Sequence, residues 1–297
     1  MNISIRHLKI FLLVCELGNM TAAARQLHIA QPSVSQVIKE IEDYYNTKLF
    51  ERIGRKIFLT KSGDKLKDYA IHIISLYDKM ESDMIGGALG GLLRLGATVT
   101  VGSCVLPDLV EKFCRQHEEI RIEAVIDNTQ EIEEMLLLDR IDIALVEGNV
   151  RSADLVSRKF MNDELILVCA ANHHLAVNDS VSITELEHED FIVREAGSGT
   201  RELFESVFAA KNVSWKQLWV SNNSEAIKKA VIRGLGVTII SAKSVREEIA
   251  SGLLKKMAIT EVSFQREFKT VYHRSKYLDA AMQLFLEFLE GSFLDII

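Results

Sequence analysis

The chain has 297 residues, which is long for one domain and comfortable for two or three compact ones. A hydrophobic content of 48% is typical of a globular protein, and no stretch approaches the ~20 apolar residues of a membrane span. The formal net charge of −7 argues against indiscriminate binding of nucleic acid by the whole surface, although residues 1–60 carry eight Lys/Arg against five Asp/Glu.

Residues 5–15 and 21–42 carry the spacing of three short helices. Apolar side chains recur there every three or four residues, which is the pattern of amphipathic helices. We expect Thr21 to cap the second helix, a tight turn at residues 28–30, and Pro32 in the first turn of the third helix. This succession is typical of a helix-turn-helix.

The third predicted helix begins with amide and hydroxyl side chains that can read base edges in a major groove. The alternative is that these are ordinary cap and surface residues. Residues 48–60 then predict two short strands turning at Gly54 and Arg55, a wing whose basic side chains would contact phosphates or the minor groove. The predicted DNA-contacting residues are Thr21, Gln31, Ser33, Ser35, Gln36, Lys39, Arg52, Arg55 and Lys56.

This N-terminal run resembles the LysR-type transcriptional regulators. The resemblance implies a winged helix-turn-helix over residues 1–59 that binds double-stranded promoter DNA, and a linker helix over residues 60–88 that dimerises antiparallel. The residues that carry it are Leu8, Phe11, Gly18, Thr21, Ala23, Ala24, Leu27, Gln31, Ser33, Ser35, Ile38, Leu49, Phe50, Arg52, Leu59, Thr60 and Gly63.

The residues themselves also predict a long helix, from Thr60 or Ser62 to about Ile85. One apolar seam, with no domain beside it in sequence, favours pairing with a second copy of the chain. The alternative is that the helix packs on its own effector domain. Glycines at 86, 87, 90 and 91 predict a break after it. The seam consists of Leu66, Tyr69, Ile73, Leu76, Tyr77 and Met80.

From Leu92 onward, short apolar strands alternate with helices, which predicts parallel-type α/β sheets covered on both faces. The expected elements include helices at 103–117, 182–188 and 199–210 and a strand at 164–170. The resemblance implies an effector-binding domain over residues 92–297 with two subdomains, similar to periplasmic solute-binding proteins. Subdomain I comprises 92–161 and 267–297, and subdomain II comprises 162–266. We expect crossover strands near residues 162–170 and 266–274, and a C-terminal helix that returns to subdomain I. The expected fold is therefore α/β with a largely helical head.

Loops that follow strands and open helices predict where a ligand binds. Gly-Ser-Gly-Thr-Arg at 197–201 resembles a signature of the branch that includes cysteine-biosynthesis and carbon-fixation regulators, with Ala196 in place of Pro. The resemblance implies a small anionic metabolite between the subdomains. Plain helix capping is the alternative for each loop, and a structural salt bridge is the alternative for Arg201. The predicted effector residues are Thr98, Thr100, Gly102, Ser103, Thr129, Glu147, Ser198, Gly199, Thr200, Arg201 and Ser224.

Enzymatic chemistry and metal binding are poorly supported. No GxSxG, HExxH or P-loop motif occurs, and the four cysteines form no CxxC pair. The side chains of His173 and His174 are expected to diverge, with no third metal ligand spaced for them. Cys104 follows a predicted helix start that can acidify its thiol for redox sensing, but a small buried side chain is the favoured interpretation. We expect no catalytic residue, no cofactor and no metal.

The sequence thus predicts a homotetrameric regulator of LysR type that acts in the cytoplasm, since the N-terminus lacks the pattern of a signal peptide. Its expected partners are promoter DNA, further copies of itself and a small anionic metabolite. RNA polymerase is a further candidate partner, and no membrane is involved. The alternative is a cytosolic solute-binding or adaptor protein with a helical head.

Overall fold

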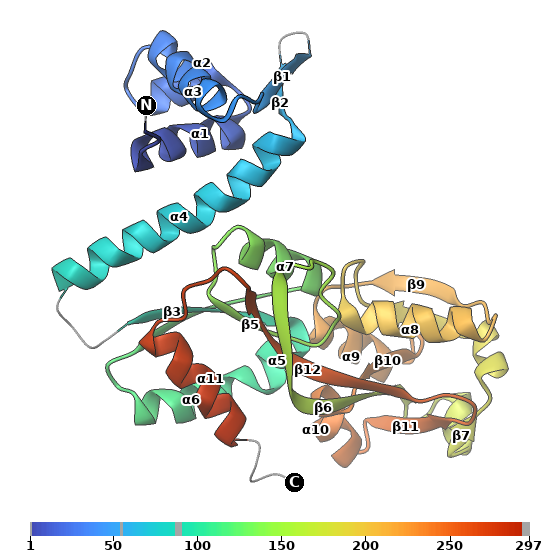
Figure 1. Cartoon of the computed structure of the whole chain (residues 1–297). Helices are drawn as coiled ribbons and strands as arrows, with labels where there is room; N and C mark the ends of the chain where they lie inside the picture. The colour runs from blue at the N-terminus through green and yellow to red at the C-terminus, as the bar shows by residue number, and fades with distance from the viewer. Residues whose placement is uncertain (1, 54–55, 87–90, 293–297) are drawn as a thin grey trace. The chain divides into compact units, whose positions relative to one another are not determined.

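The computed structural model describes residues 2–53, 56–86 and 91–292 (Figure 1). It divides into two compact units, Met1–Leu89 and Gly90–Ile297. The predicted wing turn at Gly54 and Arg55 and the predicted break at residues 87–90 lie outside the described residues. Within the described ranges, no helix combines the length and the hydropathy that crossing a membrane requires.

The first unit is a three-helix head with a two-stranded wing and one long helix. Strands β1 and β2 pair antiparallel, from Phe50↔Leu59 to Ile53↔Lys56. Buried side chains of α1, α2 and α3, among them Phe11, Ala23 and Ile38, form one core with the start of α4. The elements are α1 (Ile5–Leu17), α2 (Met20–Gln26), α3 (Gln31–Tyr45), β1 (Phe50–Ile53), β2 (Lys56–Leu59) and α4 (Lys61–Gly86).

Two helix starts in this unit show how local side chains set the element boundaries. Helix α2 is capped by Asn19, whose Oδ1 accepts hydrogen bonds from the backbone N–H groups of Thr21 (2.8 Å) and Ala22 (3.1 Å). The prediction of Thr21 as the cap is therefore wrong, because the amide of Asn19 lies two residues earlier and reaches both orphan N–H groups. At the other start, Thr60 Oγ1 accepts from Gly63 N–H at 3.0 Å, so the expected cap of α4 is present.

The first half of the second unit is built on three parallel strands. Strand β3 lies between β4 and β5 and is parallel to both. The helix expected at 103–117 is two helices, α5 and α6, with Pro107 in the first turn of the second. The C-terminal helix α11 joins the same core through Met282 and Phe285. The elements are β3 (Leu92–Thr98), α5 (Val99–Cys104), α6 (Leu106–Gln116), β4 (Arg121–Asp127), α7 (Thr129–Leu137), β5 (Ile143–Val146) and α11 (Ala280–Ser292).

The other half has its own core around Phe191, Phe204 and Phe208. Its helix α8 has the predicted bounds, whereas the helix predicted at 182–188 is a 3₁₀ turn, η2. The elements are η1 (His174–Val177), β7 (Ser180–Val181), η2 (Ile183–His188), β8 (Asp190–Val193), α8 (Gly199–Ala210), β9 (Lys216–Val220), α9 (Ser224–Ile232), β10 (Thr238–Ser241), η3 (Ala242–Val245), α10 (Arg246–Ala250) and β11 (Leu254–Ile259).

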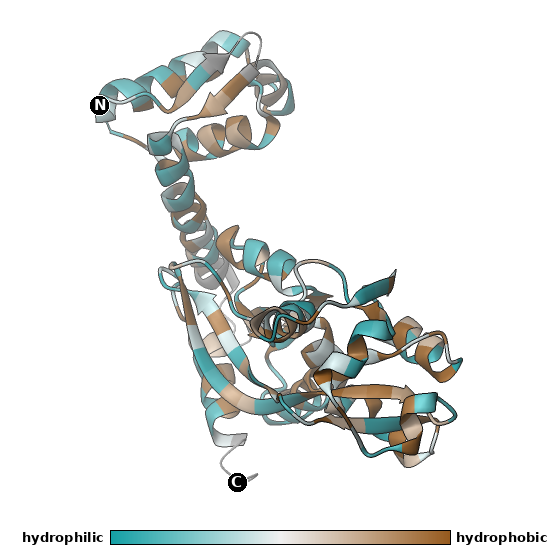
Figure 2. Ribbon diagram, turned by 90° about the vertical axis from the view of Figure 1, so that its right-hand side faces the viewer, coloured by the Kyte–Doolittle hydropathy of each residue, from teal (hydrophilic) through white to brown (hydrophobic). Residues whose placement is uncertain are grey.

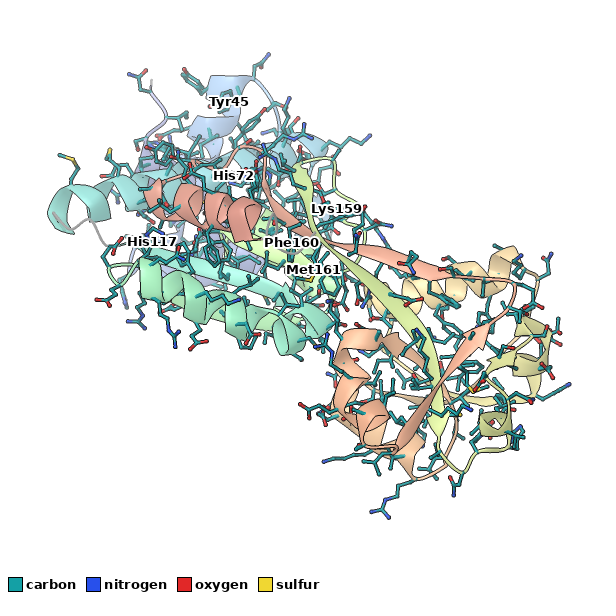
Figure 3. All side chains as sticks on the ribbon, turned by 90° about the horizontal axis from the view of Figure 1, so that it is seen from below. Tyr45, His72, His117, Lys159, Phe160 and Met161 are labelled. Atoms are coloured by element: carbon teal, nitrogen blue, oxygen red, sulfur yellow. The ribbon has the colours of Figure 1, made fainter. Side chains whose placement is uncertain are left out.

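Two long strands, β6 (Leu155–Ala170) and β12 (Phe264–His273), join the halves (Figure 3). They pair antiparallel, and the sheet order is β4-β3-β5-β12-β6-β11-β7, with β10 beside β6. The prediction of parallel-type sheets is wrong for these pairs, because β10, β11 and β12 all run antiparallel to β6. The register shifts between Phe268 and Lys269, which leaves Phe160 as an extra residue opposite them.

Candidate functional site

The outer face of α3 carries the predicted base-reading side chains. Ser33, Gln36 and Lys39 are exposed at intervals of three residues. The opposite face is buried, since Val34, Ile38 and Ile41 are at most 3% exposed in the core of the head. Gln31 and Ser35 are half-buried beside the exposed row, and Thr21 is exposed at the start of α2. An exposed row of hydroxyl, amide and ammonium groups is suited to a DNA groove.

The wing carries the predicted backbone contacts. Arg52 pairs with Ile57, and Lys56 pairs with Ile53, so the backbones of both basic residues lie in the antiparallel ladder. The side chains of Arg52 and Lys56, and Arg55 as a whole, lie outside the described residues. The role of these three residues at DNA stays a prediction.

A cavity of about 900 Å³ lies between the two halves of the second unit. From the first half it is lined by Thr100 and Ser103 of α5, and from the other half by Ser224 of α9 and Lys243 of η3. Three of these four were predicted effector residues, and Lys243 was not. Both halves therefore contribute polar side chains to the cavity, as is required of a site where the two halves bind one small ligand together.

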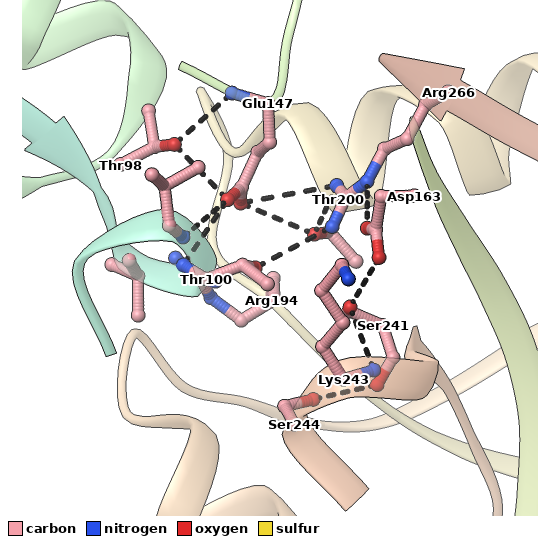
Figure 4. A network of polar contacts seen from close by, with 12 residues as sticks. Thr98, Thr100, Glu147, Asp163, Arg194, Thr200, Ser241, Lys243, Ser244 and Arg266 are labelled. Carbon is pink, nitrogen blue, oxygen red and sulfur yellow. Dashed lines mark hydrogen bonds and ion pairs between the residues drawn. The ribbon is translucent and has the colours of Figure 1, made fainter. Parts of the chain in front are cut away.

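The loop predicted to clasp an anion already holds one of the chain's own (Figure 4). Glu147 follows β5 and is 4% exposed. Its Oε2 accepts hydrogen bonds from Thr98 Oγ1 (3.0 Å) and from the backbone N–H groups of Thr100 (3.1 Å) and Val101 (3.3 Å). The carboxylate therefore lies at the start of α5, where an anionic effector was expected. An effector would have to bind the other groups that line the cavity.

Arg266 connects this carboxylate to the crossing strands (Figure 4). Its Nε lies 2.7 Å from Asp163 Oδ2, and its Nη1 donates to Thr200 Oγ1 at 3.0 Å and lies 3.9 Å from Glu147 Oε1. Glu147 and Asp163 are buried and the side chain of Arg266 is 5% exposed, which is tolerable because these charged groups are paired. Arg266 and Asp163 were not predicted from the sequence. The available signal was two ionisable residues at the predicted crossings, which the register places opposite one another.

Two predicted effector residues are buried hydroxyls with no hydrogen-bond partner among the described residues, Thr129 Oγ1 and Ser198 Oγ. They lie at a close approach of the two halves, where Thr129 and Gly148 face Gly199, the residue after Ser198. A Cβ on Gly199 would come within 2.6 Å of Gly148 Cα, so glycine is required for this approach. Buried hydroxyls are nearly always paired, and these two therefore have unused capacity to bind a polar ligand.

The cations of the cavity differ in how they are paired. Lys228 is buried and contacts Glu225 Oε1 at 2.5 Å and Glu248 Oε1 at 2.7 Å, so its charge is neutralised. Lys243 is half-buried, and no carboxylate of the described residues lies within ion-pair distance of its ammonium group. Lys243 is thus the half-buried cation whose charge is left for a bound anion.

Two predicted effector residues have structural roles instead. A Cβ on Gly102 would lie 2.8 Å from three side-chain atoms of Ile126, so this glycine allows α5 to pack against β4. The guanidinium of Arg201 donates to Glu205 Oε1 (2.7 Å), Gln217 Oε1 (3.2 Å) and the carbonyl of Arg194 (3.2 Å). The structure therefore favours the structural salt bridge that was the alternative for Arg201.

The thiol of Cys104 is not acidified. Burial, together with the negative charges of Asp163 and Glu147, raises its pKa. The alternative of a lowered pKa at a helix start is not supported, because Cys104 is the last residue of α5 and does not lie at its start. At neutral pH the thiol stays protonated, which favours the interpretation of Cys104 as a small, partly buried side chain.

The expectations that the side chains of His173 and His174 diverge and that no third possible metal ligand lies beside them are also wrong, since Glu189 lies next to both rings. Their ring centroids are 4.3 Å apart, and their Nε2 atoms lie 3.6 Å and 2.8 Å from the carboxylate of Glu189. Leu175 N–H donates to Nδ1 of His173, so the neutral ring carries its hydrogen on Nε2. A metal ion bound at this Nε2 would require the ring hydrogen on Nδ1, and the hydrogen bond from Leu175 N–H to Nδ1 would then be lost. The arrangement is better suited to pairing imidazoles with a buried carboxylate.

Comparisons with known families and proteins bear on both units. Residues 5–64 match the model of the bacterial regulatory helix-turn-helix protein, lysR family, and residues 86–293 match that of the LysR substrate binding domain. The chain is 32% identical to the HTH-type transcriptional activator CmpR of Synechocystis, covering 97% of this chain and 95% of that one. It is 29% identical to the HTH-type transcriptional regulator CysL of Bacillus subtilis, covering 96% of both.

Two solved structures have a similar fold. The regulatory domain of CcmR from Synechocystis, in complex with 2-PG, is 27% identical and covers 68% of this chain and 97% of that one, with a TM-score of 0.65. CbnR, a LysR family transcriptional regulator, covers 98% of this chain and 99% of that one with a TM-score of 0.62, at 19% identity.

Proposed function

Because the chain belongs to the LysR family of bacterial transcriptional regulators, with a helix-turn-helix head and a substrate-binding domain, we propose that α3 reads promoter DNA and that the second unit senses a small anionic metabolite. The observation that carries the first part is the exposed row of Ser33, Gln36 and Lys39 on a helix whose opposite face is the core of the head. Such a helix can enter a major groove without disturbing the packing behind it.

The DNA contacts divide into two kinds. Ser33 and Gln36, with Ser35 and Gln31 beside them, contact base edges, while Lys39 contacts phosphate. The basic residues of the wing, Arg52, Arg55 and Lys56, contact the backbone or the minor groove. Thr21, which is exposed at the start of α2, contacts the DNA backbone.

The effector occupies the cavity between the halves of the second unit. Thr100, Ser103 and Ser224 supply hydroxyl groups, and the ammonium of Lys243 supplies the charge that favours an anion. The hydroxyls of Thr129 and Ser198, which lack partners among the described residues, are further groups that a ligand reaches when the halves move. The complex of the CcmR regulatory domain with 2-PG supports a small ligand in a domain of this fold.

Signal transfer in this proposal requires self-association. The exposed apolar seam of α4 pairs two subunits, and two such pairs form a tetramer whose heads bind spaced half-sites. Ligand binding changes the relation of the halves of the second unit, and thereby the spacing of the heads and their contact with RNA polymerase. The protein acts in the cytoplasm on DNA and catalyses no reaction.

The test of DNA reading compares two DNAs. Wild-type protein and the double variant Ser33→Ala/Gln36→Ala are titrated against the DNA upstream of the chain's own gene and against a scrambled duplex at fixed salt, by fluorescence anisotropy. We expect the variant to lose roughly tenfold or more in affinity for the upstream DNA, because base contacts are lost. Affinity for the scrambled duplex, which depends on phosphate contacts, stays within about twofold.

The matched control is Gln116→Ala, which removes an exposed glutamine from α6 of the second unit. It should leave both affinities unchanged. Equal losses on the two DNAs for the double variant would refute base reading by α3, as would a wild-type protein that binds both DNAs equally.

A further inference from the structure

A chain of hydrogen bonds runs from the start of α1 to the exposed face of α3. Ser4 Oγ lies 2.6 Å from Nδ1 of His7, and Nε2 of His7 lies 3.2 Å from Glu40 Oε2. The other carboxylate oxygen, Oε1, accepts from Gln36 Nε2 at 3.0 Å. His7 and Glu40 are each 19% exposed at the side chain, whereas Ser4 and Gln36 at the two ends of this network are exposed. We name it the Ser4–Gln36 relay.

The direction of donation along the relay is fixed at its first member. The backbone N–H of Ser4 also lies 3.3 Å from Nδ1 of His7 and can only donate, so Nδ1 is an acceptor. The neutral ring then carries its hydrogen on Nε2 and donates it to Glu40. With both carboxylate oxygens accepting, the amide of Gln36 must direct an N–H toward Glu40, since the flipped amide would place oxygen against oxygen.

This orientation limits what Gln36 can offer to a base. One amide hydrogen is used by Glu40, which leaves one N–H donor and the Oε1 acceptor. Adenine presents an acceptor at N7 and a donor at N6, which this pair matches, whereas guanine presents two acceptors, N7 and O6. An unrestrained glutamine has both amide hydrogens available for guanine. A glutamine whose amide is held by Glu40 has only one amide hydrogen available.

We propose that Glu40, itself held by His7, is a positioning residue that makes Gln36 select adenine over guanine. The inference rests on the proposed function, because it requires α3 to lie in a major groove. The hydrogen bond from Gln36, followed by that from His7, lowers the pKa of the Glu40 carboxyl, so the carboxylate is ionised and accepting at neutral pH.

The experiment is binding-site selection from a randomised duplex library with the full-length protein, followed by sequencing. Wild-type protein should enrich adenine at one position of each half-site, and Gln36→Ala should lose the preference there. Glu40→Ala should lower the adenine-to-guanine ratio at that same position by roughly fivefold or more. The double variant Gln36→Ala/Glu40→Ala should have the same base preference as Gln36→Ala alone, since without Gln36 the carboxylate has no amide to hold.

Two further variants separate positioning from charge. Asp43→Ala removes an exposed carboxylate of the same helix that makes no hydrogen bond to Gln36, and should raise affinity for all sequences without changing base preference. Glu40→Gln keeps an acceptor oxygen and should restore part of the adenine preference. Thermal melting of each variant establishes that it folds. If Glu40→Ala does not fold, His7→Gln is tested in its place.

The outcomes distinguish the two levels of the proposal. Wild-type protein that enriches no sequence would overturn both the base reading by α3 and the inference built on it. Wild-type enrichment combined with an unchanged adenine-to-guanine ratio in Glu40→Ala would overturn the relay alone. A Glu40→Ala profile equal to that of Asp43→Ala would also overturn it, because the carboxylate would then act only through its charge.

Discussion

Asp142 shows how a single buried carboxylate can hold several elements of the α/β unit together. Its two oxygens accept from the backbone N–H of Arg94 (2.8 Å) and from Nε and Nη2 of the same residue (3.1 and 2.7 Å). The ammonium of Lys276 lies 2.7 Å away. The cluster thus fixes β3, the start of β5 and the segment after β12. Burial alone would raise the pKa of Asp142, but these hydrogen bonds and the charge of Lys276 prevail and lower it to about 2.

The lowered pKa has a defined consequence for stability. A carboxyl whose folded pKa lies below its unfolded value contributes stability that is present above about pH 4 and is lost as the pH falls toward 2. We therefore expect Asp142→Asn to lower the free energy of unfolding at pH 7 by about 2 kcal/mol. The deficit should shrink between pH 4 and pH 2, because the wild-type carboxyl is then also neutral. Urea unfolding followed by circular dichroism over this range measures it.

The exposed carboxylate of Asp43 supplies the control for this measurement, and Asp43→Asn should change the free energy of unfolding by less than about 0.5 kcal/mol. A deficit for Asp142→Asn that stayed constant down to pH 2 would mean that the loss comes from packing and not from the ion pairs.

Single residues also mark the limit of what the sequence could predict at the site. Thr100, Ser103 and Ser224 were found because strand ends followed by hydroxyls are visible locally. The partners of these groups were not, because Arg266 and Asp163 are 103 residues apart and meet only through the pairing of β6 with β12. Glu147 was identified as a site residue, but its role as an internal anion depends on distances that no local pattern contains.

Helix α4 carries an element-scale feature, an apolar seam that remains exposed. Tyr69, Ile73, Leu76 and Met80 are between 45% and 57% exposed and recur at intervals of four, three and four residues. Figure 2 shows hydrophobic and hydrophilic residues side by side along this helix. Exposed apolar residues at such spacing are typical of a helix that packs against another helix.

We expect Leu76→Lys/Met80→Lys to weaken self-association roughly 100-fold or more, because two charges then replace side chains buried at the seam. Sedimentation velocity over a range of protein concentrations measures the shift from oligomer to smaller species. Val177→Lys replaces an 85% exposed side chain of the second unit and should leave sedimentation unchanged. An oligomer that survives the double substitution at wild-type strength would exclude α4 as the pairing element.

The elements themselves were predictable where their pattern was local. Helix α8 begins and ends as expected, since a polar loop with Gly197 and Ser198 precedes a clear apolar stripe. Strand β6 was expected only from Glu164, because residues 157–163 are mostly polar. In the structure six of these seven residues pair with β12, and this pairing compensates for their low strand propensity.

At the scale of the whole molecule, the proposal requires the two units to influence one another. An anion that binds the folded cavity should raise the melting temperature of the full chain, which a screen of inorganic phosphate and sulfate measures. The same anion should change the affinity for upstream DNA by about 5- to 150-fold, and operator DNA should change the anion affinity by the same factor, because coupling between sites is reciprocal.

Thr100→Val tests the cavity as the source of this coupling. Among the residues that the structure describes, the hydroxyl of Thr100 makes one long hydrogen bond, 3.5 Å from Arg266 Nη2, so its loss costs the fold little. The variant should lose the thermal shift and the DNA response together while keeping its basal affinity for DNA. Thr184→Val, at an exposed hydroxyl on η2, should keep both responses. An unchanged response in Thr100→Val would remove α5 from the effector site.

The paired strands β6 and β12 restrict how any such ligand can act. The two segments that connect the halves, β6 and β12, are paired as one two-stranded ribbon (Figure 3). A movement of one half relative to the other therefore bends both connections together. The bulge at Phe160 interrupts the ladder within that ribbon and marks where its curvature is least resisted. A small molecule bound between the halves on one side of this ribbon would therefore set the angle between them.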